Sequence, residues 1–157
     1  MKMVRLTAVC IAVLAIAVSV PCAAIASDKS DVMTVIDNAV ASFNKGDMKT
    51  WEALCTSPAS IVSNIAPYQY YGPTACTDWW NSHAAYDKKN RVTDEVATLG
   101  TPWHLEVTGD RAYASIPSSF SYKQKGKAIK TSGNVLTIAL QKTSTGWLMT
   151  GWSWSQH

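Results

Sequence analysis

Apolar residues spaced three to four positions apart predict helices in the first half of the chain. The clearest series runs from Val32 to Phe43 and forms one face of a long first helix. Either Asp28 or Ser30 would cap the start of this helix with its side-chain oxygen. Gly46 stands just past its end, where a left-handed backbone is favoured.

Two further helices follow from capping residues. Asp47 would cap a short second helix at 48–54. After the Gly72-Pro73 break, Thr74 would cap a third helix at 75–86. Each helix therefore begins at a residue that can satisfy free backbone amides.

Most of the second half of the chain reads as strands joined by short turns. Leu136, Ile138 and Leu140 alternate with polar residues and fall on one face. Gly109-Asp110 is typical of a hairpin turn, and Pro117 marks a bulge or a sheet edge. Strands are expected at 60–65, 68–71, 103–108, 111–122, 131–142 and 147–155.

Helices that precede a run of antiparallel strands indicate an α+β fold. Three N-terminal helices would pack in a strongly curved, mainly antiparallel sheet. Such a sheet, wrapped over helices, leaves a pocket at its wide end, and a pocket of this kind is the first place to expect a ligand. The sequence therefore predicts one α+β domain with an internal site.

The N-terminus has the three parts of a signal peptide. Lys2 and Arg5 form a positive start, residues 6–20 are almost wholly apolar, and residues 24–26 read Ala-Ile-Ala. Small residues at these last positions predict cleavage after Ala26. The mature domain would then span 27–157 and be secreted or periplasmic.

This segment has two other interpretations. An uncleaved anchor would need about 20 apolar residues, more than this run supplies. A lipoprotein would be acylated at Cys22, but Pro21 stands where such proteins carry a small residue. After cleavage, no membrane association is expected.

Removing the signal lowers the formal charge from +3 to +1, because Lys2 and Arg5 leave with it. No basic run or stripe remains along the mature sequence, so nucleic acid is an unlikely partner.

Two cysteines remain after cleavage, Cys55 and Cys76. In an exported chain such a pair is expected to form a disulfide, worth about 3 kcal/mol in the chain-entropy model. Without a CxxC motif or a His-Cys cluster, no metal site and no cofactor are expected.

Four short motifs resemble the NTF2-like superfamily, in particular its SnoaL-like branch. They are Ala41-Ser42-Phe43-Asn44-Lys45-Gly46-Asp47 with Trp51 and Leu54, Tyr71-Gly72-Pro73-Thr74-Ala75 with Trp79-Trp80, Gly109-Asp110-Arg111-Ala112-Tyr113, and Gly146-Trp147 with Ser155. They occur in the family's order over nearly the whole mature chain. The resemblance implies a cone-shaped fold with a pocket inside. It also implies a homodimer across an outer sheet face that carries apolar residues.

The acid–base residues of enzymes with this fold are missing at the matching positions. Steroid-isomerase relatives carry a Tyr, an Asp and a second acid, where this chain has Ala39, Ser63-Asn64 and residues 132–134. Asn64 cannot titrate. No Asp-Arg-Asp set of the epoxide-hydrolase type can be assembled. The His pair of scytalone-dehydratase-like enzymes could be His83 and His104, but the supporting Asp and Tyr cannot be identified.

Three residues remain as candidate acids or bases. His83 lies one turn after Trp79 and would either face the pocket or be a histidine bonded to backbone. His104 and Glu106 alternate with apolar residues and are expected to face solvent. If the strand were reversed, they would form an acid–base pair. His157 is terminal and is expected to be disordered.

The aromatic content favours a pocket for a flat or apolar molecule. All 7 tryptophans lie in the mature chain, and most are expected in the core. Trp79 and Trp80 are adjacent on a helix, so they cannot both be deep in it. Trp152 and Trp154 share one strand face. The residues expected around one cavity are Tyr70, Trp79, Trp80, His83, Trp103 and Trp152.

Two functions stay open from the sequence. The first is a non-catalytic binding or accessory domain that holds a small apolar or aromatic molecule or a protein partner. The second is a lyase or isomerase that uses His83 or the His104/Glu106 pair. The first is favoured, because titratable groups suited to acid–base work are few.

Overall fold

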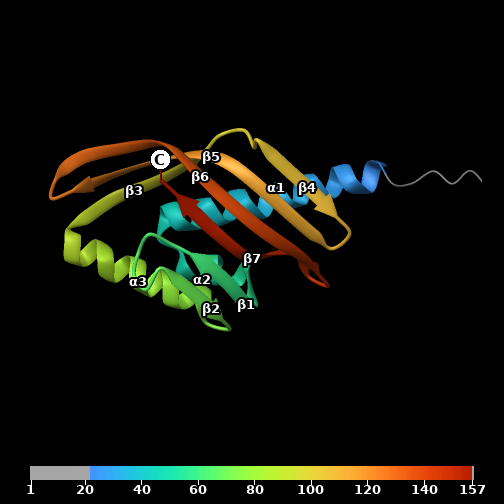
Figure 1. Cartoon of the computed structure of the whole chain (residues 1–157), viewed down its shortest axis with the longest axis horizontal. Helices are drawn as coiled ribbons and strands as arrows, with labels where there is room; N and C mark the ends of the chain where they lie inside the picture. Colours follow the sequence, from blue (N-terminus) through green and yellow to red (C-terminus); the bar gives the residue numbers. More distant parts are fainter. Residues whose placement is uncertain (1–21, 157) are drawn as a thin grey trace, which may run out of the picture.

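A computed structural model describes residues 22–156 of the 157-residue chain, with the side chains of 22–25 left out. Three helices and seven strands make up this part. They are α1 (Cys22–Lys45), α2 (Met48–Ala53), β1 (Cys55–Val62), β2 (Gln69–Gly72), α3 (Ala75–Asn90), β3 (Val92–Leu99), β4 (His104–Thr108), β5 (Arg111–Gln124), β6 (Lys127–Thr143) and β7 (Gly146–Ser155). The long strands curve over α1, as Figure 1 shows. The α+β prediction is confirmed.

The first helix starts earlier than predicted. It begins at Cys22, so neither Asp28 nor Ser30 caps it, and Asp28 instead pairs with Lys142 near the last hairpin. Its C-terminal end is as predicted, because Gly46 takes a left-handed backbone (φ 68°). The predicted signal peptide falls mainly on residues 1–21, which lie outside the described residues.

The capping prediction for α2 is confirmed. The Asp47 side chain accepts a hydrogen bond from the Thr50 amide and another from its hydroxyl. The third helix runs four residues beyond its predicted end at Tyr86 and stops where Arg91 takes a left-handed backbone. Its last turn is wholly polar, so no apolar spacing marked it as helical.

The sheet is mixed and has the strand order β2-β1-β7-β6-β5-β3, with β4 also paired to β5. Only the β1–β7 pairing is parallel among the pairings described. One edge of β5 is shared, first by β4 and then by β3. Pro117 lies between the segments that pair with β4 and β3, and the register of β5 against β6 shifts just beyond it. Proline has no backbone N–H to donate, and here neither β4 nor β3 requires one.

The strand β3 was not predicted from the sequence. Its pairing register shifts between Thr93 and Val96, and Asp94 within this bulge has a left-handed backbone (φ 57°). A bulge breaks the alternation by which a strand is recognised. The first strand was also predicted too late, since β1 begins at Cys55 and carries a register shift before Ser60.

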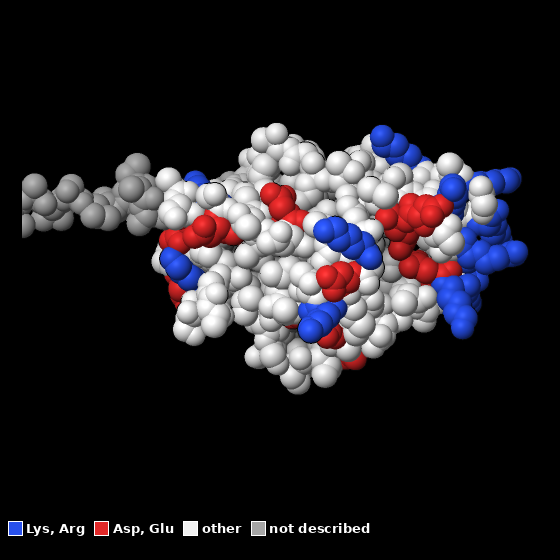
Figure 2. All heavy atoms as spheres, turned by 180° about the vertical axis from the view of Figure 1, so that it is seen from behind, with Lys and Arg blue, Asp and Glu red and all other residues white. Residues whose placement is uncertain are grey.

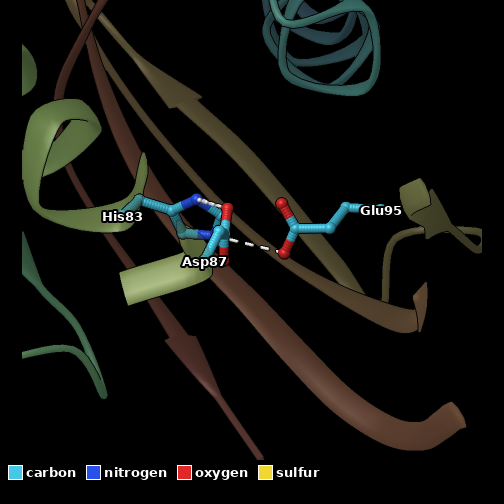
Figure 3. Close-up of side chains that lie close together, drawn as sticks. All are labelled: His83, Asp87 and Glu95. Carbon is cyan, nitrogen blue, oxygen red and sulfur yellow. Dashed lines mark ion pairs between the residues drawn. The ribbon is translucent and has the colours of Figure 1, made fainter. Parts of the chain in front are cut away.

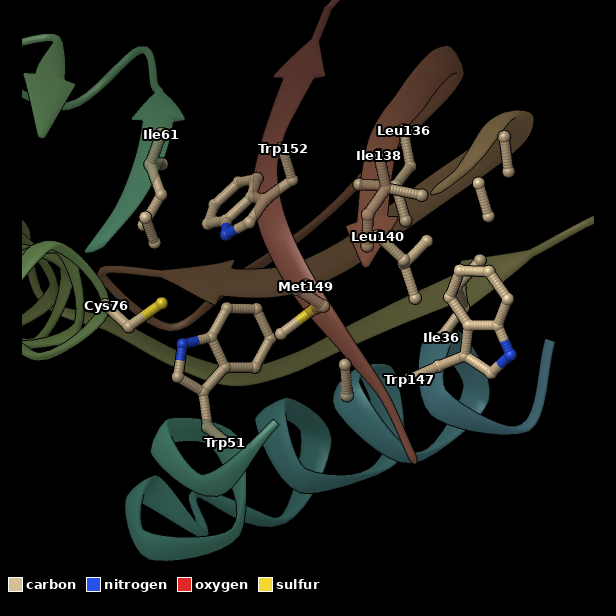
Figure 4. Packing of buried hydrophobic residues seen from close by; sticks show 14 of the residues in the cluster. Ile36, Trp51, Ile61, Cys76, Leu136, Ile138, Leu140, Trp147, Met149 and Trp152 are labelled. Carbon is tan, nitrogen blue, oxygen red and sulfur yellow. The ribbon is translucent and has the colours of Figure 1, made fainter. Parts of the chain in front are cut away.

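The core lies between the concave face of the sheet and the helices. Leu136, Ile138 and Leu140 are buried on one face of β6, as the alternation predicts. Figure 4 shows these side chains and Met149 facing α1, with Trp51 and Trp152 beside them. Four of the tryptophans are therefore core residues, namely Trp51, Trp79, Trp147 and Trp152.

A disulfide joins Cys55 and Cys76, as predicted. Cys55 is the first residue of β1, and Cys76 is the second residue of α3. The bond spans 21 positions of sequence. It therefore joins β1 to α3 directly and closes the loop that contains β2.

One side chain pairs with the backbone of β3 at Ala97. The Asn44 amide, near the end of α1, donates to the Ala97 carbonyl (2.9 Å) and accepts from the Ala97 amide (2.8 Å). These are the two bonds that a neighbouring strand residue would make. Asn44 thus fixes the end of α1 against the outer side of β3.

Folding gathers basic side chains at one end of the molecule, on the right of Figure 2. The amide of Lys125, in the β5–β6 hairpin, donates to the Arg91 carbonyl and ties the hairpin to the end of α3 (2.9 Å). The exposed cations at this end are Lys88, Lys89, Arg91, Lys123, Lys125, Lys127 and Lys130. No run in the sequence predicted this patch.

Within residues 22–156, no helix combines the length and apolarity needed to cross a membrane.

Candidate functional site

A cavity of about 140 Å³ lies between the three helices and the concave face of the sheet. Its wall is mainly aromatic and aliphatic, with a few polar groups, of which His83, Asp87 and Glu95 lie together. The lining residues are Ile36, Ala39, Val40, Phe43, Trp51, Ser63, Asn64, Ile65, Trp79, His83, Tyr86, Asp87, Val92, Glu95, Ala97, Phe120, Tyr122, Leu136, Ile138, Met149, Trp152, Trp154 and Gln156. A concave apolar site with a few convergent polar groups is the usual form of a small-molecule site.

His83 lies between two carboxyl groups in the cavity wall (Figure 3). Its Nδ1 atom is 3.1 Å from Oδ2 of Asp87, one turn further along α3, and its Nε2 atom is 3.6 Å from Oε1 of Glu95 on β3. The three side chains are only 15–19% exposed. Each ring nitrogen therefore faces a carboxyl group, which fixes the orientation of the imidazole.

The bulge in β3 accounts for the position of Glu95. Because successive side chains of a regular strand alternate between faces, one extra residue changes which side chain points inward. The register shift lies between Thr93 and Val96, around Glu95. Bulges often re-aim a side chain beside a functional site, and here the re-aimed side chain faces His83.

Burial raises the pKa of the Glu95 carboxyl to about 7, because its ionised form loses hydration there. Positive charge on His83 opposes this shift, whereas a side-chain hydrogen bond with Asp87 and the negative charge of Asp87 add to it. Glu95 therefore changes its charge near neutral pH. A carboxyl group with this property in a cavity wall is suited to hold or release a proton there.

Three buried polar atoms of lining residues have no hydrogen-bond partner within the described part of the chain. They are Oδ1 of Asp87 and the indole Nε1 atoms of Trp51 and Trp152. An unsatisfied buried polar group costs about 1–3 kcal/mol. A ligand or water that paired with these atoms would recover part of that cost.

Ionisable groups of the cavity could also hold a cation. The possible ligand atoms of His83, Asp87 and Glu95 all lie within 4.8 Å of one another. The imidazole, however, turns a different nitrogen toward each carboxyl group. A metal ion could bind only one of these nitrogens, so it would replace the contact between that nitrogen and its carboxyl group.

The structure brings three of the six predicted pocket residues to the cavity. Trp79, His83 and Trp152 line it. Trp79 stacks on Trp51, and Trp152 meets Trp79 edge-to-face at 4.5 Å between ring centroids. Trp154 also lines the cavity, on the same strand face as Trp152, as the alternation predicts.

The other three residues lie elsewhere. Trp103 is 67% exposed, just before β4. Tyr70 is buried, but its hydroxyl donates to the backbone beside Ile65 rather than lining the cavity. Trp80 is half-buried and packs on Phe43 and Trp51 behind the wall. The adjacent indoles diverge as predicted, and only Trp79 reaches the cavity.

His104 and Glu106 face solvent, the orientation favoured by the sequence. Their side chains are 54% and 64% exposed, and Nε2 of His104 lies 3.2 Å from Oε2 of Glu106. They form a pair, but on the side of the sheet away from the cavity. The reversed strand that would have placed this pair in the pocket is not found.

Sequence reasoning found His83 but missed its two partners. Asp87 lay beyond the predicted end of the third helix, and Glu95 lay on a strand that was not predicted. A carboxylate four residues after a histidine was an available signal for Asp87, since such residues share a helix face. No sequence pattern pointed to Glu95, because its position depends on the bulge.

The cavity positions that match catalytic residues of steroid-isomerase relatives carry no acid or base. Ala39, Ser63 and Asn64 line the cavity. Asn134 is buried, and its amide donates to the Thr131 hydroxyl. Proton transfer in this cavity would therefore fall to its titratable lining residues, His83, Tyr86, Asp87, Glu95 and Tyr122.

No protein-family model matches this chain, and no curated protein matches it in sequence. Solved structures do match its fold. An NTF2-like protein with a cystatin-like fold from Novosphingobium aromaticivorans aligns with a TM-score of 0.70 at 15% identity, over 85% of this chain and 84% of its own.

Two other structures agree. A hexachlorocyclohexane dehydrochlorinase, LinA-type3, from Novosphingobium barchaimii aligns with a TM-score of 0.71 at 12% identity, over 84% of this chain and 88% of its own. An NTF2-like superfamily protein from Salmonella enterica aligns with a TM-score of 0.65 at 17% identity, over 83% and 92%. The chain has the NTF2-like fold. At these identities the likeness concerns the fold alone.

Proposed function

We propose that this protein is an exported domain whose cavity binds a small apolar or aromatic molecule. The observation that carries the proposal is the composition of the cavity wall. Aromatic rings from the helices and the sheet surround it, and its two carboxyl groups, Asp87 and Glu95, lie on either side of His83. This division lets a ligand bury its apolar body while one polar group is oriented.

The size of the cavity limits the ligand to about one ring. An engineered apolar cavity of roughly 150 Å³ accepts benzene, and the cavity here measures about 140 Å³. Pockets for drug-sized molecules are larger, about 300–1,000 Å³. The proposed ligand is therefore a single-ring compound or an aliphatic molecule of similar volume.

Export is part of the proposal and has two supports. The pattern at 1–26 is that of a cleaved signal, and a disulfide such as Cys55–Cys76 persists in oxidising compartments. A mature chain that begins at Ser27 stays a prediction. The homodimer across the outer face of the sheet, and the SnoaL-like assignment, also stay predictions.

Toluene tests the binding proposal, because it fits a one-ring cavity and carries no polar group. It is expected to quench tryptophan fluorescence and to raise the melting temperature. In Trp79→Phe part of the quenching should be lost, because this indole is one of the four that line the cavity. Trp147→Phe is the matched control, since Trp147 is equally buried but is not a lining residue. Equal quenching in both variants, or none in the unaltered protein, would contradict the proposal.

A second candidate function is proton transfer on a ligand in the same cavity. The position of His83 between two carboxyl groups favours it, as does the pKa of Glu95 near 7. A general acid or base works best when its pKa lies near the working pH. The reaction would be of the lyase or isomerase type.

Acetophenone tests this candidate, because it has one ring and carries exchangeable protons beside its carbonyl. We expect the protein to accelerate exchange of these protons in D2O, followed by NMR. His83→Ala should reduce the rate by about a hundredfold or more, the usual contribution of a general base. His104→Ala, on the outer face, should leave the rate unchanged. Equal rates in the two variants would eliminate His83 as the base.

A further inference from the structure

We propose that the cavity selects a protonated organic amine of one-ring size, with its ammonium group beside Asp87 and Glu95 and its apolar body among the aromatic side chains. This inference rests on the proposed binding function and names the class of ligand. It follows from the charge of the wall, from the rings beside His83, and from one unpaired oxygen atom.

The ionisable groups of the cavity are mainly acidic. The lining residues that titrate are His83, Tyr86 and Asp87 from α3, Glu95 from β3 and Tyr122 from β5. None of the described lining residues is Lys or Arg. Asp87 and Glu95 have His83 as their only ion-pair partner within residues 22–156. With both carboxyl groups ionised, one imidazole faces two negative charges, so a positive ligand complements the cluster.

Aromatic rings stand next to this cluster. The centroids of the Trp79 and Phe43 rings lie 5.2 and 5.3 Å from that of the His83 imidazole. A cation within about 6 Å of an aromatic face is attracted by the ring quadrupole, which is how aromatic cages recognise substituted ammonium groups. An amine can thus contact carboxylates and rings at once.

An unpaired acceptor is also available. When Glu95 is protonated, its carboxyl group can hydrogen-bond to Asp87. When Glu95 is ionised, the buried Oδ1 atom of Asp87 has no hydrogen-bond partner in the described part of the chain. An acceptor requires a donor, and a primary ammonium supplies three. A carboxylate ligand has none to offer. A bare metal ion would occupy the cluster only and leave the aromatic wall without contacts.

The basic patch at the same end of α3 does not reverse this preference. Its lysines and arginine are exposed, and salt screens exposed charges over about 10 Å at 0.1 M. Asp87 and Glu95 are largely buried beside the ligand space, so their field is screened much less. The nearer, buried charges therefore determine which ligand is held.

The proposal predicts the direction of a pH effect. A cation stabilises ionised Glu95, so binding of an amine releases the proton that Glu95 holds below about pH 7. Affinity for the amine should therefore rise as the pH increases from 6 to 8. An aliphatic amine stays protonated over this range, so the change reports the protein. An anionic ligand would show the opposite trend.

The experiment compares benzylamine, benzyl alcohol and benzoate, with toluene as the apolar reference, by calorimetric titration of the whole protein. At pH 8 benzylamine is expected to bind at least about tenfold more tightly than benzyl alcohol, since charged hydrogen bonds are roughly twice as strong as neutral ones. Asp87→Asn and Glu95→Gln should each remove most of this preference and leave toluene binding within about twofold. At pH 6 the preference should shrink in the unaltered protein.

Each outcome separates this inference from the proposed function. If toluene and benzyl alcohol bind but benzylamine gains nothing, the amine inference is wrong and the binding cavity stands. If benzoate binds best, the site prefers an anionic ligand and the inference is overturned. If none of the four binds, the proposed binding function fails with it. The pH comparison uses the unaltered protein, so it decides the question even if a variant does not fold.

Discussion

Replacing Cys55 and Cys76 together by alanine is expected to lower the free energy of unfolding by about 3 kcal/mol. The disulfide links residues 21 positions apart and so reduces the number of conformations open to the unfolded chain. It also joins the start of β1 to the first turn of α3. Urea unfolding of the double variant against the unaltered protein measures the loss.

The same loss should follow reduction of the unaltered protein, while a reductant should leave the double variant unchanged. Alanine keeps both positions apolar, so the buried Cys76 site gains no unpaired polar group. The entropic account of the disulfide is contradicted if the two proteins unfold at the same urea concentration. Two free thiols per unaltered chain, titrated in denaturant without reductant, would show that the bond is absent.

Gly151→Ala should cost about 3 kcal/mol or prevent folding, because overpacking against backbone forces strands apart. A Cβ atom at this position would lie 2.5 Å from the Ser60 carbonyl oxygen. Gly151 pairs with Ser60 on β1 and with Ala139 on β6, beside register shifts in both pairings. Glycine inside a strand often marks such a close approach of two backbones.

Gly100→Ala is the matched control for this prediction. Its added Cβ would meet the side-chain Cγ of Pro117 at 3.2 Å, which a ring can yield to more easily than a backbone carbonyl. We expect this variant to lose about 1 kcal/mol or less. Thermal unfolding of both variants tests the comparison, and an equal loss in both would show that the approach of β1 to β7 is not the cause.

Regular alternation made some elements predictable and its interruption hid others. Leu136, Ile138 and Leu140 face one side of a continuous strand, so their burial followed from the period of two. The strand β3 has a bulge at Asp94, and this break removed the pattern. Propensity could not replace it, because charged residues occupy the bulge.

The candidate site was predictable only where one element carried it. His83 and Trp79 share a face of α3, so their proximity followed from helical spacing. The approach of Glu95 to His83 depends on the register of β3 against β5, which no local pattern encodes. Trp103 was expected at the cavity because it starts a predicted strand near the elements that flank the opening in relatives, but it lies just before β4 and is exposed.

The side chain of Asn44 has a consequence for how the molecule meets other copies of itself. The strands β3 and β4 share the last position in the sheet beside β5, and Asn44 occupies both backbone groups of Ala97 at the outer side of β3. A strand edge with free backbone groups is a template for aggregation. At the opposite end of the sheet, β2 has only four residues and offers little length for pairing. The backbone groups of Ala97 are thus occupied from within the molecule and β2 is short, so intermolecular strand addition is disfavoured at β2 and at this point of β3.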